Sequence, residues 1–82
     1  MTLLQDYQIQ DPEVLANLRL IRSANCGAIV REFPPIGSQE GTLYEVSARR
    51  NGRPVYGNRS ANLLHASKTV AQKVVRDWSA AN

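Results

Sequence analysis

The fold is decided by residues 42–57, TLYEVSARRNGRPVYG. Two strand-like runs, 42–50 and 53–57, flank Asn51-Gly52, the pair that best fits a two-residue type I′ turn because both turn positions need a positive φ. The stretch therefore predicts a β-hairpin in which Arg50 faces Arg53 and Ala48 faces Val55. This register gives the hairpin a core face, made of Tyr44, Val46, Ala48 and Val55, and an outer face, made of Leu43, Glu45, Ser47 and Tyr56.

The hairpin needs a further strand beside it, and residues 28–33 supply one. Ile29, Arg31 and Phe33 alternate onto one face of this strand, and Pro34-Pro35 ends it because neither proline can donate to a ladder. Residues 36–41 predict a flexible loop. Because Pro54 is tolerated only where its missing donor would point to solvent, we expect the last strand to lie at a sheet edge.

A first helix is predicted from Asp11-Pro12-Glu13 to Asn25-Cys26-Gly27. Asp11 fits the N-cap, Pro12 the first helical position, and Glu13 the positive end of the helix dipole. Asn25 and Gly27 tolerate the left-handed backbone that ends many helices. The apolar stripe of this helix contains Val14, Leu15, Leu18 and Ile21.

A second helical pattern follows the hairpin, with an apolar face of Val70, Ala71, Val74, Val75 and Trp78. Its start is open between Ser60 and Ser67, both of which can cap a helix. We favour the longer helix, with a kink near residues 65–67. Trp78 is expected to pack against Val46 or Ala48.

These elements predict an α+β domain: helix, three-stranded antiparallel sheet, helix, with both helices on one sheet face. Residues 11–82 form the single domain, preceded by a polar N-terminal arm at residues 1–10. The alternation in residues 7–10 fits a short strand or docked arm, and a loose tail fits equally well. We expect a monomer or a weak dimer.

Composition narrows the class of protein. The chain has 82 residues, of which 43% are hydrophobic and 21% charged, values typical of a globular domain. The single cysteine, Cys26, excludes an internal disulfide and favours a reducing compartment. No apolar run reaches the length of a membrane span, and the first residues lack the basic and apolar regions of a signal peptide. We therefore expect a cytoplasmic protein without a membrane partner.

Residues that could carry catalysis are scarce. His65 and Cys26 are the only histidine and thiol, and the carboxylates are dispersed along the chain. One cysteine and one histidine cannot make a structural zinc site, and no glycine-rich phosphate loop is present. The sequence therefore predicts no enzyme and no cofactor.

The basic residues are the one group of side chains that indicates a function. The net charge is +3 and the isoelectric point about 9.5. Three arginines lie beside the predicted turn, another follows the hairpin, and more basic residues lie on the second helix. Tyr56 is the one aromatic side chain placed to stack on a base. A solvated turn that resists edge aggregation is the alternative interpretation. The predicted nucleic-acid-binding residues are Arg49, Arg50, Arg53, Tyr56, Arg59, Lys68, Lys73 and Arg76.

The order of elements resembles a double-stranded RNA-binding domain. The matching segments are residues 42–46, the Asn51-Gly52 turn and residues 67–75, whose Ser67, Lys68, Ala71, Val74 and Val75 occupy the family's helix-start and sheet-packing positions. Thr69 and Gln72 replace basic residues of the family, and residues 37–41 stand where the family has a Gly-Pro-x-His loop. The same order of elements occurs in sheet-reading DNA-binding domains of phage-type integrases.

Two functions remain open. The first is a small nucleic-acid-binding module, for DNA or RNA, that uses the arginine hairpin and the basic helix side. The second is a protein-interaction module, such as a small regulator or inhibitor, that uses the open sheet face or adds a strand at the sheet edge.

Overall fold

The structure, a computed structural model, describes residues 1–37 and 41–78. The side chain of Trp78 lies outside this description, and so does its predicted packing against Val46 or Ala48. Within the described residues, neither helix combines the length and apolar character needed to cross a lipid bilayer.

The sheet has four strands, so the predicted three-stranded sheet is wrong. The strands are β1 (Thr2–Leu4), β2 (Gly27–Phe33), β3 (Leu43–Arg50) and β4 (Arg53–Ser60). Each pairs antiparallel with its neighbour in the order β1-β2-β3-β4. Three residues are too few to show a strand periodicity, so β1 is recognised only from its pairing with β2, in which Leu4 aligns with Val30.

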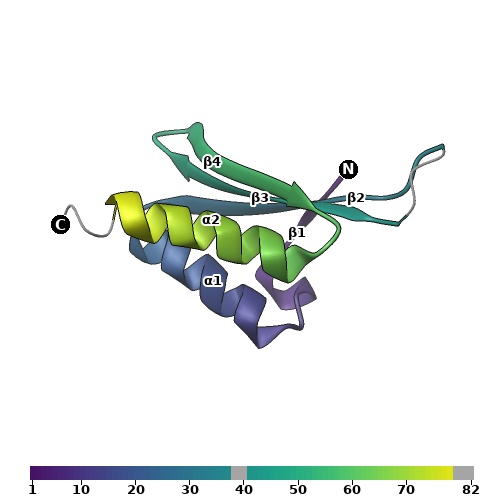
Figure 1. The fold of residues 1–82 in the computed structure, drawn as a ribbon, viewed down its shortest axis with the longest axis horizontal. Coiled ribbons are helices and arrows are strands. Elements are labelled where there is room, and N and C mark those ends of the chain that lie inside the picture. Colours follow the sequence, from purple (N-terminus) through teal and green to yellow (C-terminus); the bar gives the residue numbers. More distant parts are fainter. Residues whose placement is uncertain (38–40, 79–82) are drawn as a thin grey trace.

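Two helices cover one face of the sheet and leave the other open (Figure 1). They are α1 (Pro12–Ser23) and α2 (Leu63–Trp78). Both helices start at the same end of the molecule, since Asp11, Val14, Asn62 and Leu63 line one cavity of about 550 Å³. The helices therefore run side by side in the same direction.

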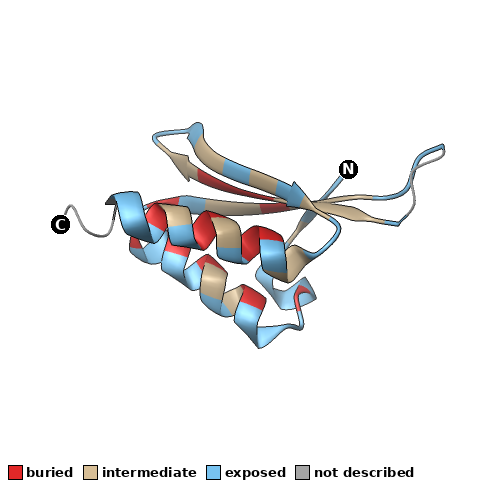
Figure 2. Ribbon diagram, viewed as in Figure 1, coloured by how far each residue is buried: buried red, intermediate tan, exposed pale blue. Residues whose placement is uncertain are grey.

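The core lies between the helices and the sheet, where buried residues line the facing surfaces (Figure 2). The largest fully buried side chains come from α1, β3 and α2: Val14, Leu18, Ile21, Val46, Ser67, Val70 and Val74. The predicted apolar stripe of α1 is confirmed for three of its members, and Leu15 packs against the core from its edge.

The ends of α1 match the prediction. The Asp11 side chain accepts a hydrogen bond from the Glu13 backbone N–H at 2.9 Å, and Pro12 is the first helical residue. Asn25, after the helix, has a φ of 64°. The backbone therefore leaves the helix through the left-handed turn that asparagine tolerates.

α2 begins near Ser60, as expected for the longer helix, and Asn62 provides the cap. The Asn62 Oδ1 accepts from the His65 backbone N–H at 3.1 Å, while the Ser60 Oγ accepts from the Asn62 backbone N–H at 3.0 Å. Ser67 is not a cap but an interior residue with no exposed surface. The helix runs from Leu63 to Trp78 without interruption at residues 65–67.

The first ten residues contribute to the folded body. After β1, a short 3-10 turn (Asp6–Gln8) returns the chain to the helix side, where Ile9 is only 7% exposed. Asp6 accepts two hydrogen bonds from Arg22 of α1, at 2.6 and 2.9 Å. This segment is thus fixed by one strand, one core side chain and one ion pair.

Candidate nucleic-acid interface

The arginine hairpin forms as predicted at its tip. Asn51 and Gly52 have φ values of 54° and 77°, as a type I′ turn requires. Arg50 and Arg53 are direct cross-strand partners. The Arg49 guanidinium donates to the Gly52 carbonyl at 2.7 Å, which ties this side chain back onto the turn.

A β-bulge changes the register below the tip and corrects the predicted position of Tyr56. The pairing shifts between Ala48 and Arg49, so that Ala48 faces Tyr56 and not Val55. The extra residue of a bulge places two side chains opposite one. Val55 and Tyr56 both pack against the core, and Tyr56 lies on the helix side of the sheet. The expected stacking surface on the outer face is therefore wrong.

Tyr56 instead connects β4 to the last turn of α2. Its hydroxyl donates to the Asp77 carboxylate, which also accepts from the Arg76 guanidinium at 2.7 and 3.2 Å. The hydrogen bonds from Arg76 and then Tyr56 lower the pKa of Asp77 to about 2. Asp77 is therefore ionised at neutral pH, and it holds Arg76 at the hairpin end of the molecule.

This end of the molecule is basic. The hairpin tip and the C-terminal end of α2 lie together (Figure 1). Among the described residues, the hairpin tip and the C-terminal half of α2 carry five basic side chains and one carboxylate: Arg49, Arg50, Arg53, Lys73, Arg76 and Asp77. Arg49 and Arg53 form no ion pair within the described part of the chain.

The opposite end is acidic. Asp11 and Glu13 begin α1, and Glu32 lies near the end of β2, where Asp11 and Glu32 line the same cavity. The charge of the domain is thus separated along the helices, with an acidic end at the two helix starts and a basic end at the hairpin. Such a distribution favours approach of a polyanion to the hairpin end.

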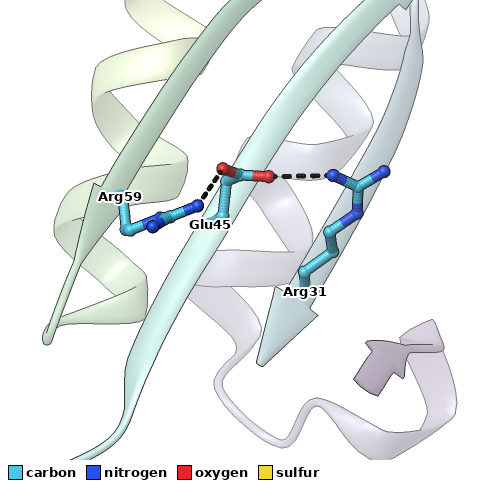
Figure 3. A network of polar contacts seen from close by, with 3 residues as sticks. All are labelled: Arg31, Glu45 and Arg59. Atoms are coloured by element: carbon cyan, nitrogen blue, oxygen red, sulfur yellow. Dashed lines mark hydrogen bonds and ion pairs between the residues drawn. The ribbon is translucent and has the colours of Figure 1, made fainter. Parts of the chain in front are cut away.

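Arg59 belongs to a separate cluster on the open face of the sheet (Figure 3). Glu45 lies between two arginines, accepting from Arg31 at 3.2 Å and from Arg59 at 3.1 Å. The Arg59 guanidinium also lies 4.5 Å from the centre of the Phe33 ring. Arg59 is therefore engaged in the sheet surface and does not join the hairpin arginines.

Lys68 lies in a third place, the groove between α1 and α2. The predicted site residues thus divide into three groups: the basic end, the open sheet face and the groove.

The sequence prediction missed Arg31 as a partner of Glu45. The predicted alternation of Ile29, Arg31 and Phe33 was confirmed, and these side chains lie on the open face. The cluster could not be predicted from this alternation, because it depends on the pairing of Arg31 with Glu45 across β2 and β3.

The two residues considered for nucleophilic chemistry do not meet. Cys26 is buried after α1, with its thiol 3.8 Å from the Ala24 carbonyl, at the end of the sheet where Gly27 pairs with Arg49. His65 is exposed in the first turn of α2, at the other end. Across the described residues, no three His, Cys, Asp or Glu side chains gather as a metal site would require.

Comparisons with protein-family models, curated proteins and solved structures found no significant match. The resemblance to a double-stranded RNA-binding domain therefore stays a prediction.

Proposed function

We propose that this protein is a small nucleic-acid-binding module whose contact surface is the basic end. The contact residues are Arg49, Arg50 and Arg53 on the hairpin, with Lys73 and Arg76 beside them on α2. Tyr56, Arg59 and Lys68 are left out of this surface because they lie on the helix face, the open sheet face and the inter-helix groove.

The observation that carries the proposal is the pairing of Arg50 with Arg53. Like charges directly opposite each other in an antiparallel pair destabilise it. A phosphate group bound at the tip would remove this cost, since guanidinium groups donate paired hydrogen bonds to phosphate oxygens. The arrangement therefore supports the binding of a phosphate group at the hairpin tip.

The direct test is binding of short labelled DNA and RNA, duplex and single-stranded, followed by fluorescence anisotropy at several salt concentrations. Phosphate contacts release counterions, so the logarithm of the binding constant should fall linearly with the logarithm of salt concentration. Replacing Arg50 and Arg53 together with serine should flatten that slope by about 0.7–0.9 for each phosphate that the protein no longer neutralises. Binding should weaken on all sequences alike.

Single substitutions provide a matched control. Arg53→Ser and Arg19→Ser each remove one exposed positive charge, but Arg19 belongs to α1 and not to the hairpin. Arg53→Ser should weaken binding several-fold more than Arg19→Ser. Equal effects would mean that only net charge matters and would overturn the assignment of the site. If the parent protein binds no nucleic acid at low salt, the protein-interaction alternative replaces this proposal.

A further inference from the structure

The last strand, β4, is an edge of the sheet with unpaired backbone on its outer side (Figure 1). Among the described residues it pairs only with β3, and it is 8 residues long, whereas the strand at the other edge, β1, has 3. A long edge strand presents backbone N–H and C=O groups to which another strand can pair. The part of β4 next to the turn is protected, because Pro54 and the bulge at Val55 interrupt its edge. Residues 56–60 contain neither a proline nor a bulge.

The strand register shows which of these residues direct their backbone groups outward. Arg50 and Arg53 flank a two-residue turn and therefore exchange hydrogen bonds with each other. Bonded and non-bonded pairs then alternate along the antiparallel ladder. After the bulge, every second residue of β4, starting with Tyr56, is bonded to β3. Gly57 and Arg59 lie between these residues, so their N–H and C=O groups point away from the sheet.

Glycine at position 57 is not required by the fold of a single chain. Its φ is not positive, and a Cβ atom there would meet the Ser47 Oγ and the Val46 carbonyl oxygen at 3.8 Å, an ordinary contact distance. Glycine inside a strand is unfavourable, because it loses more conformational freedom on folding than any other residue. Such a glycine often marks a place where another backbone approaches closely. Gly57 therefore indicates a contact at the outer side of β4.

We propose that β4 pairs antiparallel with β4 of a second copy of the chain, with a two-fold axis at Asn58. The axis places Gly57 of each copy opposite Arg59 of the other copy. Because both residues direct their backbone groups outward, the two pairs together form four backbone hydrogen bonds. The Arg59 side chain faces a residue without a side chain, so it keeps its 3.1 Å ion pair with Glu45. The two sheets then become one continuous sheet.

The sequence of β4 favours this register over its neighbours. Since only Gly57 and Arg59 point outward in residues 56–60, the two-fold axis can lie at position 57, 58 or 59. An axis at Arg59 sets two arginines directly opposite each other, which is destabilising. An axis at Gly57 pairs Arg59 with Val55, the bulge residue, whose backbone lies outside the regular ladder. The axis at Asn58 avoids both, and this self-complementarity is why the edge is assigned to a second copy.

Asn58 provides an independent reason for a partner at the axis. Its side-chain oxygen, Oδ1, is buried and accepts no hydrogen bond within the described part of the chain. A buried acceptor without a partner is unfavourable. Across the axis, the two Asn58 residues form a non-hydrogen-bonded pair, in which the Cα atoms are only about 4.5 Å apart. When the side chains turn towards the axis, each amide N–H can donate to the Oδ1 of the other copy.

The dimer should be weak, because residues 56–60 of each copy bury less surface than a standard specific interface. We expect a dissociation constant in the high micromolar range or above. The inference does not depend on the proposed function, since self-association is measured without nucleic acid.

The test is sedimentation equilibrium of the full chain up to millimolar concentration, where the parent should show a reversible monomer–dimer equilibrium. Gly57→Lys should weaken the dimer about tenfold, because it sets a lysine opposite Arg59 of the second copy and this contact occurs twice. Gly27→Lys is the matched control. Gly27 is also an exposed strand glycine with room for a Cβ atom and an arginine, Arg49, opposite it, but it belongs to the inner strand β2. Equal effects of the two substitutions would overturn the proposal, as would a parent that stays monomeric throughout.

A disulfide tests the position of the axis. In a Cys26→Ala background, Asn58→Cys should give a cross-linked dimer on mild oxidation, because the expected Cα separation lies within the range that a disulfide spans. Ser60→Cys is the control, since Ser60 is also half-buried and on the same face of β4, but the axis places it opposite Tyr56 of the second copy. Cross-linking of both variants alike, or of neither, would contradict the axis at Asn58. Thermal unfolding of each variant separates weaker association from a failure to fold.

Discussion

Ser67 is a polar side chain in the centre of an otherwise apolar helix contact. It has no exposed surface, and its Oγ accepts from Asn17 and donates to the Leu64 carbonyl at 3.0 Å. Both hydrogen-bonding functions of the hydroxyl are thus satisfied, which is what allows a serine to be buried. The groove above it depends on this contact because it fixes how α1 and α2 lie against each other.

Ser67→Ala should therefore destabilise the domain by about 1 kcal/mol, because the Asn17 amide is deprived of its partner in a half-buried position. Ser23→Ala is the control, since Ser23 also donates to a carbonyl three residues earlier but is exposed. Its effect on the free energy of unfolding should be close to zero. Urea denaturation measures both, and equal effects would contradict this role of Ser67.

Two leucines of α1 that are two residues apart differ completely in burial. Leu18 has no exposed surface, whereas Leu20 is 46% exposed. Leu18→Ala should cost about 2.7–5 kcal/mol, since it removes buried methyl groups and leaves a cavity. Leu20→Ala should cost far less. Thermal or urea unfolding of the two variants gives the comparison.

At the scale of the elements, the last turn of α2 is attached to β4 by the hydrogen bond that the Tyr56 hydroxyl donates to the Asp77 carboxylate. The pKa of Asp77 falls from its ordinary 3.8 to about 2. A carboxyl group with a lowered pKa in the folded state stabilises that state fully above its unfolded pKa. The contribution is lost as the pH falls from 3.8 towards 2.

The attachment predicts a measurable titration. The Asp77 carboxyl signal in NMR should titrate with a midpoint near 2. Tyr56→Phe removes the donated hydroxyl hydrogen bond, so the midpoint should rise towards the ordinary value. An unchanged midpoint in Tyr56→Phe would show that Tyr56 does not hold the helix end in solution.

At the scale of the whole molecule, the N-terminal segment completes the sheet. Deleting residues 1–10 removes β1, the half-buried Leu4 and the buried Ile9. Burying an aliphatic side chain of this size contributes about 1.5–3 kcal/mol, so the deletion should remove much of the stability of so small a domain. Tyr7→Ala, at an 85% exposed position, should leave the midpoint of unfolding nearly unchanged. A deletion variant as stable as the parent would show that residues 1–10 are a loose arm that does not stabilise the domain.

The sequence by itself determined the local features of this protein. The Asp11-Pro12 start, the Asn25 end and the Asn51-Gly52 turn were all correct, because each depends on the backbone preference or hydrogen bonding of one or two residues. The alternation of Ile29, Arg31 and Phe33 onto one face of β2 was correct for the same reason, since side-chain direction follows from strand geometry alone.

The features that depend on contacts between residues far apart in the sequence were decided only by the tertiary structure. β1 is recognisable only from its pairing with β2, and the bulge that turns Tyr56 towards α2 is stabilised by core packing and by Asp77, 21 residues away. The same applies to the division of the basic residues into three groups and to the groove between the helices. Sequence periodicity predicts which face of a helix or strand a residue occupies, whereas packing and strand register determine which residues that face contacts.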